Sequence, residues 1–217
     1  MGGGSAAARP VGLALAVVVA CATGPLAGQG SRWTAGIVVG TARFAGASSE
    51  ITPSPAGFRF APYRPVFYGL FLERGSNVRV GLRVATASSA VSLEGHGPAG
   101  AGGGTVSVVA EGAFRVASVG ALVSAPVFRV SPSASVRAGL GGHWERWTSL
   151  GETARSLVGL DGSAQFELSL GRHWVTHVSA GAGFDPRSPF AAGDLPNGFE
   201  PAHMWRVGFG AGMGYRW

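Results

Sequence analysis

The fold is decided by the last thirteen residues, 205–217, which read WRVGFGAGMGYRW. Every second residue of this stretch is apolar or aromatic, and only glycine and arginine stand between them. The apolar set comprises Trp205, Val207, Phe209, Ala211, Met213, Tyr215 and Trp217. Because successive side chains of a β-strand point to opposite faces, this period of two predicts a strand with one apolar face and one face of glycine and arginine.

The same alternation recurs upstream through most of the chain. It is clear in residues 78–84, 136–145, 163–170 and 174–184, and two further strands with less regular faces are predicted at 32–44 and 64–74. The stretch 105–130 is long for a single strand, so we expect a bulge or break near Ser118–Gly120. With the C-terminal strand, these segments make eight.

The connections alternate in length, which indicates an up-and-down order. Short turns are predicted at 75–77, 131–133 and 171–173, and long Gly/Pro-rich connections at 45–63, 95–104, 149–162 and 185–202. Short turns at one end and long loops at the other are typical of transmembrane β-barrels.

Two features indicate that the apolar face meets lipid rather than a soluble core. Tryptophans stand near strand ends on that face, at Trp144, Trp174, Trp205 and Trp217, as in the aromatic girdles of membrane proteins. Glycine on the opposite face suits the narrow interior of an eight-stranded barrel. The sequence therefore predicts an all-β protein, an eight-stranded antiparallel transmembrane up-and-down β-barrel with an N-terminal signal peptide.

The N-terminus has the pattern of an export signal. Residues 11–20 are ten consecutive apolar residues, too few to span a membrane as a helix. We expect a signal peptide over 1–28 and the outer-membrane barrel over 29–217. Residues 18–21 also resemble a lipobox, so the mature N-terminus is either Gln29 or a lipidated Cys21.

Composition excludes two other classes of protein. All 17 basic residues are arginine, and they are scattered singly among acidic residues, which excludes a nucleic-acid-binding surface. The single cysteine, Cys21, excludes an internal disulfide framework.

The C-terminal pattern resembles the insertion signal of bacterial outer-membrane barrels, carried here by Phe209, Ala211, Met213, Tyr215 and Trp217. Over 29–217 the chain is similar to the small OmpA/OmpX-like barrels. The resemblance implies location in the bacterial outer membrane, insertion by the outer-membrane assembly machinery, contact with outer-membrane lipids and lipopolysaccharide, and four long loops exposed outside, where they bind any extracellular ligand.

The inner face is predicted to carry a lumen charge cluster. Its members are Arg79, Arg83, Glu111, Arg115, Arg137, Glu145, Glu167 and Arg206. Unpaired charge is costly inside a barrel of eight strands, so we expect arginine–carboxylate pairs that plug the lumen. A narrow pore selective for anions is the alternative.

One pair of residues raises an enzymatic alternative. His177 and Ser179 lie two apart, on one strand face, and resemble the His-x-Ser pair of outer-membrane lipid A deacylases. Glu145 and Glu167 are the candidates for the carboxylate that would orient the histidine. However, the pair shares a face with Gly181 and Gly183, which is the predicted lumen, and it lies near a short turn rather than the lipid-facing outer end.

No metal site or cofactor is predicted, because the histidines lack a recognised ligand spacing and the glycine run 100–104 reads as a loop. Aromatic and basic residues between Phe58 and Phe67 form a patch that either binds lipopolysaccharide phosphates or a surface partner, or anchors the barrel at the interface. The sequence thus predicts a non-enzymatic outer-membrane barrel with an envelope-structural or loop-mediated binding role. A lipid A-modifying acyl hydrolase and a narrow pore are the alternatives.

Overall fold

The computed structural model describes residues 32–53, 57–95, 105–149 and 154–217, with the backbone alone described for 105–111. These residues form eight strands and one short 3-10 helix, η2 (Ala192–Asp194). The strands are β1 (Trp33–Glu50), β2 (Arg59–Gly75), β3 (Arg79–Gly95), β4 (Thr105–Ser131), β5 (Ala134–Ser149), β6 (Ala154–Leu170), β7 (Trp174–Asp185) and β8 (Phe199–Arg216). Among the described residues, no helix is both long and apolar enough to cross a membrane.

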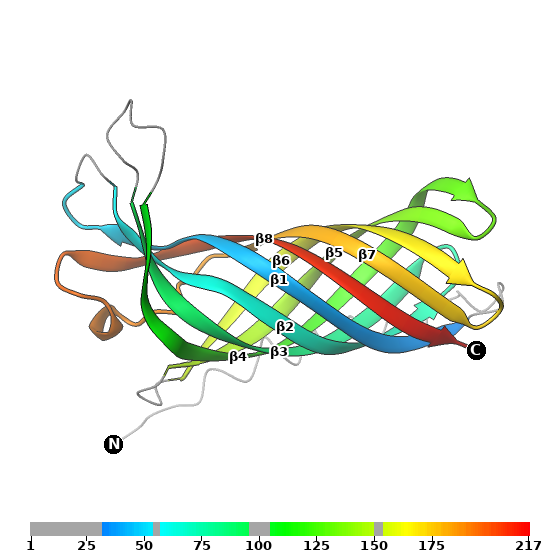
Figure 1. Ribbon diagram of the computed structural model, residues 1–217, viewed down its shortest axis with the longest axis horizontal. Coiled ribbons are helices and arrows are strands. Elements are labelled where there is room, and N and C mark those ends of the chain that lie inside the picture. Colours follow the sequence, from blue (N-terminus) through cyan, green and yellow to red (C-terminus); the bar gives the residue numbers. More distant parts are fainter. Residues whose placement is uncertain (1–31, 54–56, 96–104, 150–153) are drawn as a thin grey trace, which may run out of the picture.

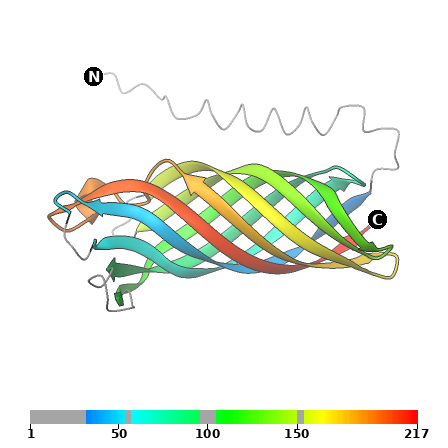
Figure 2. The same cartoon turned by 90° about the horizontal axis from the view of Figure 1, so that it is seen from above.

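The strands close into a single barrel. Each strand pairs antiparallel with the next, and β1 also pairs with β8, so the ladder has no open edge. Figures 1 and 2 show an elongated barrel of strongly tilted strands. Closure matters in a bilayer because every backbone polar group needs a partner within the protein. The predicted all-β, eight-stranded up-and-down architecture is confirmed.

The three predicted short turns are present and lie at one end of the barrel, together with the C-terminus (Figure 1). Gly75 ends β2 with φ 128, and a Cβ at this position would lie 2.1 Å from the carbonyl oxygen of Val78. Only glycine fits such a backbone without strain. This end is called the short-turn end below, and the opposite one the long-loop end.

The strands reach further toward the long-loop end than predicted. Strand β1 continues to Glu50, β2 begins at Arg59, and β6 begins at Ala154, so much of the predicted connections 45–63 and 149–162 is strand. The reason is pairing between strands, as in the register match of Arg59 with Glu94, which sequence alternation alone does not reveal. Because about 9–11 tilted residues span a bilayer, strands of 17 or 18 residues such as β1 to β3 project beyond it.

The predicted bulge near Ser118–Gly120 is wrong. Strand β4 runs unbroken through these residues, which pair regularly with β3 and with β5. The irregularities lie instead near its two ends. The register shifts after Pro126, a residue without an amide hydrogen to donate, and again in the pairing around Ser89–Ser92 with the stretch near Gly112, which has φ 62.

The outer wall carries a continuous apolar surface. The exposed fractions of Leu140, Leu160 and Phe209 are 75%, 68% and 64%. Trp174 and Trp205 are about half exposed, at 50% and 52%, and lie toward opposite ends of the strands. An apolar surface of this kind, bordered by tryptophan, belongs against lipid rather than water.

The lumen contains more apolar side chains than the prediction of a glycine- and arginine-filled interior allowed. At the long-loop end it holds a packed cluster, called the apolar plug here, made of Phe44, Phe114, Trp147, Leu157, Phe190 and Met204. The Trp147 ring lies edge-to-face against Phe44 and Phe114, with ring centroids 5.7 Å apart in both pairs. Charged groups occupy the lumen on the other side of this plug.

Candidate functional site: the barrel lumen

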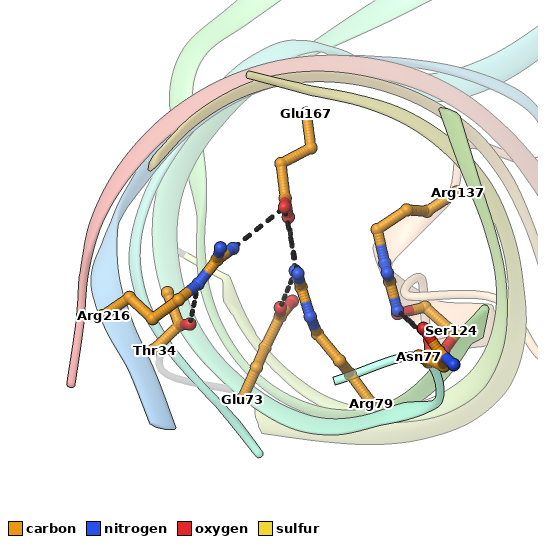
Figure 3. A network of polar contacts seen from close by, with 8 residues as sticks. All are labelled: Thr34, Glu73, Asn77, Arg79, Ser124, Arg137, Glu167 and Arg216. Atoms are coloured by element: carbon orange, nitrogen blue, oxygen red, sulfur yellow. Dashed lines mark hydrogen bonds and ion pairs between the residues drawn. The ribbon is translucent and has the colours of Figure 1, made fainter. Parts of the chain in front are cut away.

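Four charged side chains meet in the lumen at the short-turn end, and we call them the short-turn network (Figure 3). Glu167 Oε1 lies 2.9 Å from Arg79 Nη2 and 2.9 Å from Arg216 Nη2. Glu73 completes the network, with its Oε2 3.5 Å from Arg79 Nη1. Two carboxylates thus face two guanidinium groups, so the charges within the network balance.

Arg137 lies beside this network, and no carboxylate of the described residues lies within ion-pair distance of it. It is 4% exposed, and its Nη2 donates to the carbonyl oxygens of Asn77 at 2.7 Å and Ser124 at 3.1 Å (Figure 3). Neutral oxygens from the short turn and from β4 therefore solvate this guanidinium in place of water.

A second charged cluster lies further along the lumen, next to the apolar plug. It consists of His143, Glu145, Asp161, Asp185 and Arg206, and is called the His143 cluster here. His143 Nδ1 lies 2.8 Å from Asp161 Oδ2, and His143 Nε2 lies 2.7 Å from Asp185 Oδ1. Arg206 pairs with Glu145 and, through Nη2 at 2.7 Å, with Asp161 Oδ1.

Local sequence explains why these groups fit side by side. A Cβ on Gly159 would lie 2.4 Å from Asp185 Oδ1 and 2.5 Å from His143 Cε1, so β6 must carry glycine there. The plug also contributes a contact, because Trp147 Nε1 donates to Glu145 Oε2 at 2.8 Å. The apolar plug and the His143 cluster are therefore one packed unit.

A small cavity occupies the middle of the lumen. It measures about 230 Å³, and its lining includes His143, Asp161, Arg206 and Arg83 together with several glycines. Along β5 its lining residue Gly142 lies between Arg137 and Trp147, so the cavity lies between the short-turn network and the apolar plug. The His143 cluster thus has space on its open side.

The predicted lumen residues divide into three groups. Arg79, Arg137, Glu145 and Glu167 are buried inside the barrel, and Arg83 and Arg206 are half-buried there. The side chain of Glu111 lies outside the described residues.

Arg115 is the exception, because its side chain is exposed on the outer wall. Its neighbours Phe114 and Val116 take the inner face, with exposed fractions of 4% and 1%. Assigning Arg115 to the lumen was therefore wrong. Pairing with β3 is regular from Phe114 to Ser124, and Arg115 shares the outward phase of Val119 and Val123, so its charge alone did not indicate its face.

Several lumen residues were not predicted from sequence as members of the charge cluster. They are Glu73, His143, Asp161, Asp185 and Arg216. The alternation could have assigned two of them to the inner face. Asp161 lies in phase with Ser163, and Arg216 lies in phase with the glycines of β8. Which partner each would meet depends on barrel closure, which the alternation does not encode.

The His177 and Ser179 pair does not form a nucleophile and base. His177 is 3% exposed, packs edge-to-face against Phe71, and its Nε2 has no hydrogen-bond partner in the described part of the chain. Within the described part of the chain, no hydrogen bond joins His177 to Ser179. Glu167, on the neighbouring strand, is already held by Arg79 and Arg216.

The aromatic-basic patch predicted between residues 58 and 67 is divided by the barrel wall. Phe60 is 8% exposed and packs in the core, and Phe67 packs against the same core from a partly buried position. Arg59 pairs with Glu94 at 3.1 Å. Tyr63 and Arg64 remain together on the outside, with the guanidinium carbon 5.4 Å from the tyrosine ring centroid, and Phe58 is 38% exposed.

The remaining sequence predictions fall in two places. The signal peptide 1–28, the choice between Gln29 and Cys21, and the glycine run 100–104 lie outside the described residues. The C-terminal signal residues lie on the outer wall, where Phe209, Met213 and Trp217 are 64%, 43% and 56% exposed and Ala211 and Tyr215 share the same face.

Comparison with known proteins supports the architecture. No family model and no curated protein matches the chain. Among solved structures, the outer membrane protein OprG of Pseudomonas aeruginosa superposes with a TM-score of 0.51 at 14% identity, covering 86% of this chain and 95% of that one. Neisserial surface protein A superposes with a TM-score of 0.51 at 10% identity, covering 85% and 96%. The chain has the fold of the small eight-stranded outer-membrane β-barrels, and its exposed apolar wall is suited to contact with lipid.

Proposed function

We propose that this chain is a non-enzymatic outer-membrane barrel with a closed lumen, which acts as a component of the envelope and binds partners at its long-loop end. The observation that carries this proposal is the apolar plug. Phe44, Phe114 and Trp147 fill the long-loop end of the lumen, with exposed fractions of 1%, 4% and 1%. Ions crossing the barrel would have to displace these packed rings.

The short-turn network supports closure from the other side. Arg79 and Glu167 are 8% and 6% exposed at their side chains and are held across the lumen by Arg216 and Glu73. Opening a path here would separate buried ion pairs, which costs several kcal/mol. Both barriers disfavour the narrow-pore alternative.

The unassembled His177 and Ser179 pair disfavours the acyl hydrolase. The buried histidine contacts Phe71 instead of a carboxylate, and its strand face belongs to the lumen rather than to lipid. A hydrolase acting on lipid A would need the hydroxyl and its base open to the outer leaflet.

Lipopolysaccharide contact is supported by the outer wall. Arg64 of β2 and Arg115 of β4 are both exposed and line one surface hollow with Tyr63 and Tyr68. Guanidinium groups bind phosphate through paired hydrogen bonds, and aromatic rings are suited to the interface beside them. Strands that project beyond the bilayer present the long loops to the exterior, where a binding partner would meet them.

Single-channel recording tests the closed lumen. Protein extracted from outer membranes in detergent is added to planar bilayers, alongside a known porin as the positive control. We expect a silent trace at moderate voltage. Discrete, reproducible conductance steps from folded protein would overturn the closed-lumen proposal.

Mass spectrometry of lipid A tests the non-enzymatic assignment. Lipid A from cells that express the chain is compared with lipid A from cells carrying the empty vector. We expect identical acylation. Loss of an acyl chain that disappears in a Ser179→Ala variant would overturn the assignment in favour of the hydrolase.

A further inference from the structure

The His143 cluster contains more negative than positive charge. Glu145, Asp161 and Asp185 contribute three carboxylates, which meet one guanidinium, that of Arg206, and the imidazole of His143, which adds one positive charge when it is protonated. Even with a protonated imidazole, the carboxylates outnumber the positive groups by three to two. The short-turn network, by contrast, pairs two carboxylates with two guanidinium groups. Buried charge of one sign is expensive unless a counter-charge reaches it.

One carboxylate oxygen of the cluster is also unpartnered. Asp185 is 0% exposed, and its Oδ2 has no hydrogen-bond partner in the described part of the chain. A carboxylate offers about four acceptor positions, and a buried one without donors is rare in native structures. Among the described residues, Oδ1 of Asp185 is partnered by His143 Nε2, whereas Oδ2 has no donor within hydrogen-bonding distance.

The neighbouring groups are ligands of the right kind for a cation. One ligand atom each from His143, Glu145 and Asp185 lies within 4.8 Å of the others, and all three residues are buried. Ligand atoms about 3.4 Å apart follow from zinc bond lengths of about 2.1 Å in tetrahedral geometry, so a modest side-chain adjustment closes the set. An imidazole nitrogen favours borderline transition ions over Mg²⁺ or Ca²⁺, which prefer oxygen ligands alone.

Access and space are provided as well. The 230 Å³ cavity is lined by His143 and Glu145, so a water molecule can approach the cluster from that side. Gly159 keeps the β6 side of the His143–Asp185 pair free of a side chain, since a Cβ there would lie 2.4 Å from Asp185 Oδ1 and 2.5 Å from His143 Cε1. Three protein ligands with a fourth position open to water is a recurrent zinc arrangement.

We propose that His143, Glu145 and Asp185 bind a single divalent transition-metal ion of the zinc class inside the barrel, with Arg206 and Asp161 as its outer partners. The ion supplies the missing positive charge and connects β5 to β7 beside the apolar plug. This site goes beyond the proposed envelope role and is independent of what the loops bind.

Zinc binding by the whole protein is the first test. Protein purified from membranes in detergent is stripped with chelator, then titrated with Zn²⁺ and assayed for bound metal by elemental analysis. A double variant, His173→Ala with His203→Ala, serves as the control because both of these histidines are exposed. We expect one zinc per chain in both proteins. A stoichiometry below one-tenth in the unaltered protein, or its loss in the control, overturns the proposal.

Ligand variants provide the second test. His143→Ala and the nearly isosteric Asp185→Asn should each weaken zinc binding by at least about tenfold, the range seen even for outer-sphere partners. Heat-modifiable gel migration and circular dichroism show which variants are folded, and Asp185→Asn alone suffices if His143→Ala is not. Unchanged zinc affinity in a folded ligand variant overturns the assignment.

Cobalt substitution supplies a readout that needs no variant. Co²⁺ bound by one imidazole and two carboxylates should give visible d–d absorption that saturates at one equivalent and is displaced by Zn²⁺ but not by equal Mg²⁺ or Ca²⁺. Displacement by Mg²⁺ or Ca²⁺ at the same concentration would mean that the imidazole is not a ligand and would overturn the site.

Discussion

The two ends of the lumen are closed by different interactions, ion pairs at one end and aromatic packing at the other. At the short-turn end, Glu73, Arg79, Glu167 and Arg216 form a balanced ionic network across the barrel. At the long-loop end, Phe44, Phe114 and Trp147 exclude water by packing, and the acid-rich His143 cluster lies beneath them. A barrel with glycine-rich inner faces can therefore close its lumen in two ways, with paired charges or with a few packed aromatic rings.

Removing the central ring of the plug should have the largest effect. Trp147→Ala deletes a side chain that is 1% exposed and also removes the indole donor to Glu145. We expect a loss of about 5 kcal/mol in unfolding free energy, from the cavity and the unpaired carboxylate together. Guanidinium unfolding followed by circular dichroism measures it.

Trp174→Ala is the matched control, because this tryptophan is 50% exposed on the outer wall. Trp174→Ala should lower the free energy of unfolding by less than half as much as Trp147→Ala. Equal losses for the two tryptophans would show that the plug contributes no more than the lipid-facing girdle, and the comparison between the two ends would fail.

Disrupting the short-turn network should lower the free energy of unfolding somewhat less than Trp147→Ala does. Glu167→Gln leaves Arg79 and Arg216 without their shared carboxylate, and we expect a loss of about 3 kcal/mol, the lower end for an orphaned buried charge. The single variant Arg79→Met and the double variant Arg79→Met with Glu167→Gln complete the cycle, and the double variant should lose less than the sum of the two single losses. Strict additivity of these two single losses in the same unfolding assay would contradict the network.

A methyl group added beside the His143 cluster should have a smaller effect on stability and tests how tightly the cluster is packed. Gly159→Ala places a methyl group within 2.5 Å of His143 and Asp185, whereas Gly120→Ala meets nothing closer than 3.5 Å. We expect Gly159→Ala to lower the free energy of unfolding by about 1–3 kcal/mol and Gly120→Ala to leave it nearly unchanged, because only the first methyl group would be overpacked. Thermal unfolding of both variants checks the difference, and equal melting temperatures would contradict it.

The smallest effect is expected at Ser179. This residue is half-buried beside the mid-lumen cavity, and its hydroxyl makes no hydrogen bond to the other described residues. Ser179→Ala should change the unfolding free energy by no more than about 0.5 kcal/mol and leave the lipid A mass spectrum unchanged. A changed spectrum would instead identify Ser179 as part of a catalytic site.

Much of the fold was predictable because the period-two signal is strong and local. In the 205–217 stretch the alternation of aromatic residues with glycine and arginine has no competing helical interpretation. Three short turns carried their own signals in glycine, serine and proline, and all three are present. At 105–130, both the bulge near Ser118 and the face of Arg115 were predicted wrongly. Strand β4 pairs regularly from Phe114 to Ser124, and Arg115 lies in phase with the outward Val119 and Val123.

The site was only partly predictable. Arg79, Glu167 and Arg206 follow from alternation, because a charged residue in phase with glycine belongs to the inner face. Their partners do not follow from it. Glu167 meets Arg79 from 88 positions away and Arg216 from 49, distances over which only closure of the ring brings side chains together.

The sequence by itself determined the class of this protein: eight alternating strands, a lipid-facing wall with tryptophan near its ends, and an interior where glycine leaves room for charge. These features are local, because each depends on which face of a strand a residue takes. Only the tertiary structure decided which charges pair, where aromatic rings block the lumen, and that His143, Glu145 and Asp185 converge. The reason is that stagger and closure of the barrel bring together residues on strands far apart in the chain, and neither can be read from a single strand.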